Sequence, residues 1–245
     1  MAKGISVLYG VVVYLLFLAT FLYAIGFVWD VVVPKTLDSG AAGPVAIAVL
    51  VDAILLGIFA VQHSVMARPW FKRAWTKVVP RHAERTTYVL LTNLCLILLY
   101  WQWRPLPSVV WDVENAGGRA ALIGLSALGW LMVLVCTFLI DHGELFGLRQ
   151  VLVYAGGKEF RSAEFKEPLF YKWCRHPMML GFLFAFWAAP RMTMGHLLFA
   201  VATSGYILLA IQFEEHDLMK AHGDDYRSYR GRTSMILPMM KKSRD

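Results

Sequence analysis

Residues 120–140 read AALIGLSALGWLMVLVCTFLI, an apolar run without a single charged side chain. A helix of about 20 apolar residues is long enough to cross the hydrocarbon core of a bilayer. The chain as a whole has the same character, since 58% of its 245 residues are hydrophobic and 17% are charged. Soluble domains are nearer half apolar and about a quarter charged. The composition therefore excludes a disordered chain, a collagen-like chain and an ordinary soluble enzyme, and it predicts a helical membrane protein.

Apolar blocks also lie on both sides of this run, at residues 5–28, 44–61, 86–103, 178–189 and 194–213. The first block is too long for the core of a signal peptide and has no small-residue cleavage site, so we expect it to be retained. Residues 178–189 are too few for a full crossing, and Pro190 and Arg191 turn the chain into the last block. We predict an all-α integral membrane fold with five full transmembrane helices plus a short hairpin helix.

Basic residues predict the orientation of these helices. Most of the 24 Lys and Arg residues lie at residues 62–85, at residues 141–175 and after Phe213, whereas the other connections hold only Lys35, Arg104, Arg119 and Arg191. Cytoplasmic loops carry such an excess of positive charge, so both termini are expected in the cytosol. The same rule explains the net charge of +7 without nucleic-acid binding. We expect residues 1–140 to form a four-span bundle and residues 141–245 a catalytic region with a cytosolic lobe.

The cysteines and possible metal ligands indicate neither a disulfide framework nor a metal site. Cys95, Cys136 and Cys174 are odd in number and have no metal-ligand spacing. Asp141, His142 and Glu144 lie close together, but no second cluster of ligands accompanies them. The sequence has no internal repeat, which argues against a transporter built from repeated halves.

Unusual polar residues flank the hairpin. Arg175-His176-Pro177 precedes it, at an expected helix N-terminus where proline is favoured and an anion is stabilised. Glu214-Glu215 follows it, and Tyr226 and Tyr229 then share one helical face. Taken singly, these motifs are equally consistent with a basic anchor at the lipid surface and a solvated helix end.

The order of these motifs resembles the integral-membrane methyltransferase superfamily that includes the isoprenylcysteine carboxyl methyltransferases. The resemblance covers residues 165–238 and implies a cytosolic site for S-adenosyl-L-methionine. It implies that Arg175 and His176 meet the cofactor's carboxylate and that Glu214 or Glu215 takes its amino group or ribose hydroxyls. The other cofactor-binding residues expected are Phe165, Tyr171, Pro177, Gly181, Tyr226 and Tyr229.

Four further stretches resemble the bacterial nurim-like branch of this superfamily, namely His63–Arg68, Glu84–Leu90, Trp101–Pro105 and Phe146–Val151. Within that branch the chain is similar to the methanethiol S-methyltransferases. The resemblance implies transfer of a methyl group to methanethiol, giving dimethyl sulfide, in the bacterial inner membrane. Methylation of a lipid or prenylcysteine and a non-enzymatic role like that of nurim are the alternatives. The oligomeric state is open.

A thiol acceptor reacts as its thiolate, so a base or a positive charge near the cytosolic ends of the spans would assist. His142, steadied by Asp141 or Glu144, is our first candidate for the base. His63 and Arg149 are further candidates, and all five residues are equally consistent with anchoring the ends of spans at the interface. Asp52 lies inside an apolar block, where it is either functional or paired with Asn93 or a hydroxyl.

Overall fold

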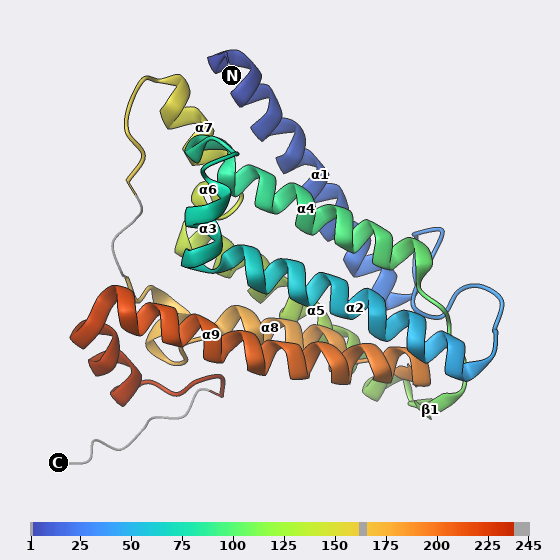
Figure 1. Cartoon of the computed structure of the whole chain (residues 1–245). Coiled ribbons are helices and arrows are strands. Elements are labelled where there is room, and N and C mark those ends of the chain that lie inside the picture. Colours follow the sequence, from blue (N-terminus) through green and yellow to red (C-terminus); the bar gives the residue numbers. More distant parts are fainter. Residues whose placement is uncertain (1, 162–165, 238–245) are drawn as a thin grey trace. The chain divides into compact units, whose positions relative to one another are not determined.

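The computed structural model describes residues 2–161 and 166–237 and is predominantly helical (Figure 1). The first half of the chain contains α1 (Lys3–Trp29), α2 (Val45–Ala67), α3 (Pro69–Trp75), α4 (Arg81–Gln102), β1 (Val109–Asp112) and α5 (Ala116–Ile140). The second half contains α6 (His142–Leu145), α7 (Leu148–Ala155), the 3-10 helix η1 (Leu169–Lys172), α8 (Pro177–Trp187), β2 (Arg191–Thr193) and α9 (Met194–Arg232). β1 and β2 pair as a two-stranded sheet, which the hydropathy pattern did not predict.

Each apolar block of the sequence forms a helix. Among the described residues, α1, α2, α5 and α9 are long and apolar enough to cross a membrane, and α8 is a shorter apolar helix. The protein is therefore a multi-pass helical membrane protein. Helix α4 covers the expected block 86–103, but its first turns carry Arg81, Glu84 and Arg85 and it is not one of these four helices. The fifth span remains a prediction.

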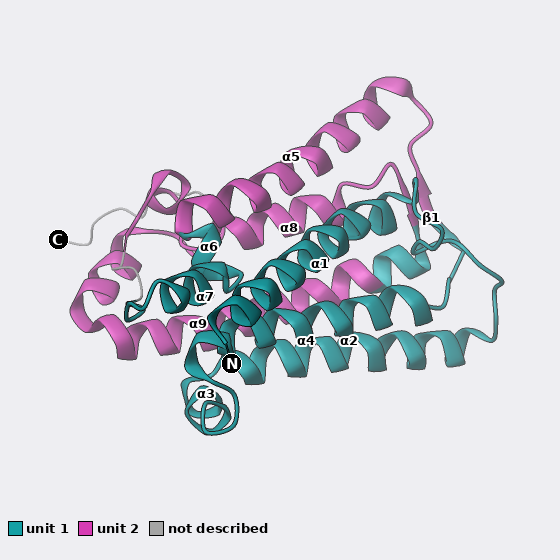
Figure 2. Ribbon diagram, turned by 90° about the horizontal axis from the view of Figure 1, so that it is seen from above, with its two compact units in different colours: residues 1–109, 141–162, 193–198 teal, residues 110–140, 163–192, 199–245 magenta. Residues whose placement is uncertain are grey.

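The described residues form two compact units (Figure 2). Unit 1 contains residues 2–109, 141–161 and 193–198, and unit 2 contains residues 110–140, 166–192 and 199–237. Each unit combines segments that are distant in the sequence.

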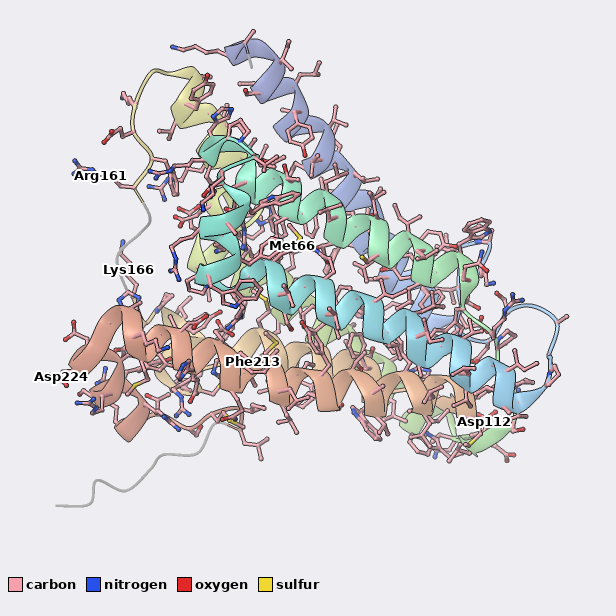
Figure 3. All side chains as sticks on the ribbon, in the orientation of Figure 1. Met66, Asp112, Arg161, Lys166, Phe213 and Asp224 are labelled. Atoms are coloured by element: carbon pink, nitrogen blue, oxygen red, sulfur yellow. The ribbon has the colours of Figure 1, made fainter. Side chains whose placement is uncertain are left out.

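In unit 1, α1 and α2 both pack against α4, and α7 packs against α1. Five buried side chains form the centre of its core, Val13, Met66, Tyr88, Val89 and Phe146. Figure 3 labels Met66 at the end of α2. Between α6 and α7 the backbone adopts φ +83° at Gly147, where a side chain would also collide with Thr86. Glycine is required there because it alone adopts this conformation without strain.

In unit 2, α5 and α8 lie in close backbone contact. A Cβ atom at Gly129 would lie 2.5 Å from the carbonyl oxygen of Gly181, and one at Gly181 would lie 2.8 Å from that of Gly129. The hydroxyl of Ser126 donates to the carbonyl of Ala185 at 2.9 Å across the same contact. Helices in membranes approach in this way where small residues face each other.

Helix α9 continues well beyond the expected apolar block 194–213. Its backbone leaves the helical region at Gly223, with φ +53°, and the helix changes direction there. Figure 3 labels Phe213 along the helix and Asp224 at this turn. The turn produces a separate polar segment at residues 224–232, which carries Tyr226 and Tyr229.

Candidate active site

The first turn of α8 is held by the end of the described chain. The backbone N–H of Arg175 donates to Ser234 at 2.9 Å, and that of His176 donates to Met235 at 3.1 Å. Pro177 is the first residue of α8, as expected for a residue that lacks an N–H. Two segments nearly 60 residues apart in sequence thus fix the position of the Arg175-His176 pair.

Arg175 and Glu215 form a buried ion pair in unit 2. The Nε atom of Arg175 donates to Oε1 of Glu215 at 2.7 Å, and both side chains are about 5% exposed or less. The guanidinium also donates through Nη1 to the backbone carbonyls of Arg230 and Thr233. Arg175 therefore ties α9 and its polar end to the start of α8.

His176 lies between the two adjacent carboxylates. Its Nε2 atom is 3.2 Å from Oε1 of Glu215, and its Nδ1 atom is 3.7 Å from Oε2 of Glu214. The second oxygen of Glu215 lies 3.2 Å from Nε of Arg230, so Glu215 is paired on both oxygens. The side chain of Glu214 is 47% exposed. Of the two carboxylates, Glu214 is the one that a ligand can reach.

Three tyrosines complete this cluster. Tyr226 and Tyr229 are buried, with ring centroids 5.8 Å apart, and the hydroxyl of Tyr229 donates to the carbonyl of Tyr171 at 2.6 Å. Burial, assisted by the neighbouring Cys136 and Glu214, raises the pKa of Tyr171 well above its usual range. The raised pKa favours the protonated form of this phenol.

Gly181 and Phe165 differ from the other expected cofactor-binding residues. The close approach expected at Gly181 is present, but it is α5 that approaches, so the structure assigns Gly181 a packing role. Phe165 lies outside the described residues. The remaining expected residues, Tyr171, Arg175, His176, Pro177, Glu214, Glu215, Tyr226 and Tyr229, all belong to unit 2.

The residues expected to act on the thiol all belong to unit 1. Asp141 caps α6 by accepting the N–H of Glu144 at 2.8 Å, and its other oxygen pairs with Arg149. Arg149 also lies 3.3 Å from Glu144. Arg149 thus bridges the two carboxylates that were expected to steady His142.

His142 has a partner that the sequence did not indicate. Its Nε2 atom is 2.9 Å from the hydroxyl of Tyr14 in α1. Its ring also meets Phe146 edge-on, with centroids 4.9 Å apart. Burial lowers the pKa of His142, against an opposing effect of Asp141. The lowered pKa favours the neutral imidazole, which has a lone pair to accept a proton.

His63 contacts the same core from α2. The hydroxyl of Tyr88 lies 3.0 Å from its ring nitrogens, and the ring stacks on Phe59. Because Tyr88 and Phe146 belong to one core cluster, His63 and His142 both border that cluster. Asp52 is elsewhere in unit 1, where it is fully buried and accepts the backbone N–H of Arg104 at 2.8 Å.

Comparison with known proteins identifies the family. The model of the family described as NnrU protein matches residues 49–240, which is well over half of the chain. The chain belongs to the NnrU protein family. No solved structure matches it significantly.

Two methanethiol S-methyltransferases are similar to this NnrU family chain over nearly its whole length, and a nurim is similar over about two thirds of it. A methanethiol S-methyltransferase of Mycobacterium tuberculosis is 57% identical, with 97% of this chain and 98% of the relative covered. Methanethiol S-methyltransferase 1 of Bradyrhizobium diazoefficiens is 53% identical, with coverage of 96% and 83%. Nurim of Mus musculus is 30% identical, with coverage of 68% and 66%.

Sequence reasoning missed three contributors to these clusters in the NnrU family chain. Arg230 pairs with Glu215, and the backbone carbonyl of Thr233 accepts a hydrogen bond from Arg175. Neither was singled out, because both lie in a basic tail and basic tails are common in membrane proteins. Tyr14 lies in an apolar block, where an aromatic side chain usually packs against other helices or lies at the interface. Among residues 2–161 and 166–237, no group of three His, Cys, Asp or Glu side chains is arranged to hold a metal ion.

Proposed function

We propose that this chain is an S-adenosyl-L-methionine-dependent methyltransferase that converts methanethiol to dimethyl sulfide. The observation that carries the proposal is the similarity to methanethiol S-methyltransferases at 57% and 53% identity over nearly the whole chain. The charged cluster around His176 supports it, since it offers the exposed carboxylate of Glu214 beside the imidazole of His176.

The side chains of unit 2 fit the proposed cofactor. When bound, S-adenosyl-L-methionine supplies an electrophilic methyl group on a sulfonium. Glu214 is half-exposed and would accept hydrogen bonds from an ammonium or from ribose hydroxyls. His176 would donate to a carboxylate, and Tyr171 lies in the same cluster through its contact with Tyr229. Arg175 and Glu215 would position this set through their own ion pair, because Arg175 donates both to Glu215 and to the backbone carbonyl of Thr233.

The side chains of unit 1 would act on the thiol. His142 is the proposed base, with Asp141 and Glu144 supplying negative charge and Arg149 positive charge around it. His63 remains a second candidate. Methyl transfer is an in-line displacement, so the protein chiefly positions the reactants, excludes water and takes one proton.

We further propose that the protein lies in the bacterial inner membrane with both termini in the cytosol. The five full spans would be α1, α2, α4, α5 and α9. The short helix α8 would pair with α9 as a hairpin and so keep both termini on the same side. Residues 1–140 would then supply most of the membrane bundle, and residues 141–245 most of the cofactor-binding residues.

The test uses purified full-length protein in detergent, S-adenosyl-L-methionine and methanethiol, with headspace gas chromatography for dimethyl sulfide and calorimetry for cofactor binding. We expect product from the parent. Glu214→Gln should weaken cofactor binding, because it removes the negative charge that faces the ligand. Asp224→Asn is the matched control, since Asp224 is an exposed carboxylate of the same helix that pairs with Arg227.

The other outcomes decide between the alternatives. Cofactor binding without dimethyl sulfide would favour a lipid or prenylcysteine acceptor, which the same assay tests with those acceptors. Neither binding nor product would contradict the enzyme and favour a non-enzymatic nurim-like protein.

A further inference from the structure

Tyr14 and His142 form a tertiary hydrogen bond between residues that are 128 positions apart. Tyr14 lies in α1 and His142 in the short α6, and both belong to unit 1. The hydroxyl oxygen and the Nε2 atom are 2.9 Å apart, which is a normal length for such a bond. Both side chains are partly buried, so neither is sealed off from a small molecule.

The surroundings of this pair suit a small sulfur compound. Tyr14 meets His142 edge-on at 5.6 Å, Phe17 lies 6.5 Å from the same ring, and Phe17 stacks on Phe146 at 3.7 Å. Sulfur makes favourable contacts with aromatic rings. The ring of His142 is thus held among three aromatic side chains and presents one nitrogen to a phenol.

Charged side chains of α4, α6 and α7 lie in the same part of unit 1 as this pair. Asp141 and Glu144 are bridged by Arg149 of α7, and Arg85 of α4 donates to the carbonyl of Leu145 at 2.7 Å. Of these groups, Asp141 raises the pKa of His142 against the effect of burial.

We propose that Tyr14 is a catalytic residue that relays the proton of the thiol acceptor to His142. This inference rests on the proposed function. The S–H bond of methanethiol breaks, and its proton bonds to the phenol oxygen of Tyr14 while the phenol's own proton passes to Nε2 of His142. The electron pair of the S–H bond stays on sulfur, which becomes the nucleophile. The imidazolium of His142 then returns its proton to water.

The lowered pKa of His142 agrees with this role, because a neutral imidazole has a lone pair to accept the proton. The aromatic surroundings agree as well, since sulfur makes favourable contacts with aromatic rings. A purely structural hydrogen bond would not require either property.

The test compares Tyr14→Phe with Tyr9→Phe in the full-length protein. Tyr9 is the matched control because it lies on the same helix, packs on the same core cluster and has one hydroxyl partner, Thr87 at 3.0 Å. The turnover number for methanethiol is measured from about pH 6.5 to about pH 9.5, over which a free thiol becomes increasingly ionised. Calorimetry with S-adenosyl-L-methionine checks that each variant is folded.

At neutral pH we expect Tyr14→Phe to lower turnover by about 100-fold, the lower range for loss of acid–base catalysis, without weakening cofactor binding. The ratio of parent to variant turnover should fall as pH rises, because the thiol ionises without the relay. His142→Gln should show the same loss, and the double variant should lose no more than either alone.

Three results would overturn the relay while leaving the proposed function intact: a ratio that does not change with pH, an equal loss in Tyr9→Phe, or full activity of Tyr14→Phe. A parent that binds the cofactor but makes no dimethyl sulfide at any pH would contradict the proposed acceptor and the relay together.

Discussion

At the scale of single residues, two adjacent glutamates have different environments. Glu215 is 3% exposed and faces Arg175, His176 and Arg230, whereas the side chain of Glu214 is 47% exposed. A buried charge is tolerated only when it is paired, and removing one partner leaves the others without compensation. Glu215 therefore stabilises the fold, and Glu214 remains available to a ligand.

This difference predicts that the same substitution affects stability at Glu215 and cofactor binding at Glu214. Glu215→Gln should lower the free energy of unfolding by roughly 3 kcal/mol, the usual cost of breaking a buried ion pair. Glu214→Gln should leave it nearly unchanged and weaken cofactor binding instead. Thermal unfolding in detergent, with calorimetry for binding, checks both. Equal melting temperatures of the two variants would contradict the assignment.

Asp52 gives a second prediction at this scale. It is fully buried, its Oδ1 atom accepts the N–H of Arg104, and its Oδ2 atom has no partner among the described residues. Asp52→Asn keeps the acceptor and removes a costly buried carboxyl. We therefore expect a melting temperature close to that of the parent and an activity within about twofold of it. Asp52→Ala orphans the N–H of Arg104 and should cost about 1–3 kcal/mol of stability.

The measurement is thermal unfolding together with the dimethyl sulfide assay. A large loss of activity in Asp52→Asn at unchanged stability would show that Asp52 functions in the reaction rather than in the fold.

At the scale of elements, the helices were largely predictable. Each apolar block of the sequence coincides with a helix, because only a helix satisfies its own backbone hydrogen bonds in lipid. The polar ends were not predictable, since α9 runs to Arg232 and turns at Gly223 in a segment with no hydropathy signal.

The contact of α5 with α8 yields a prediction for helix packing. Gly129→Ala would place a methyl group 2.5 Å from the carbonyl of Gly181, so the two helices must separate. Overpacking of this kind typically costs about 1–3 kcal/mol, which thermal unfolding would detect.

Gly124→Ala is the control for this substitution. Gly124 lies on the same helix, and a Cβ atom there would meet no described atom within 4 Å beyond the adjoining turns of α5. The Gly124→Ala variant should therefore unfold at the parent's temperature or slightly above it, because alanine favours the helix. A Gly129→Ala variant as stable as this control would show that the helices are not in close contact.

At the scale of the whole molecule, the distribution of basic residues predicts the orientation of the spans. A cysteine placed at Glu114, in the connection after β1, should react with a membrane-impermeant thiol reagent added outside the cell. A cysteine at Lys77, in the connection after α3, should react only in inverted vesicles. Both positions are exposed in the structure. The opposite labelling pattern would reverse the proposed topology.

The sequence by itself determined the class of protein, the positions of its apolar helices and its family. These properties depend on local composition, because the length and hydrophobicity of a segment decide whether it can enter a bilayer. Only the tertiary structure decided that Glu215 is buried while Glu214 is exposed, that Gly181 meets Gly129, and that Tyr14 contacts His142. Such pairings join residues far apart in the chain, and side-chain packing rather than hydropathy selects them.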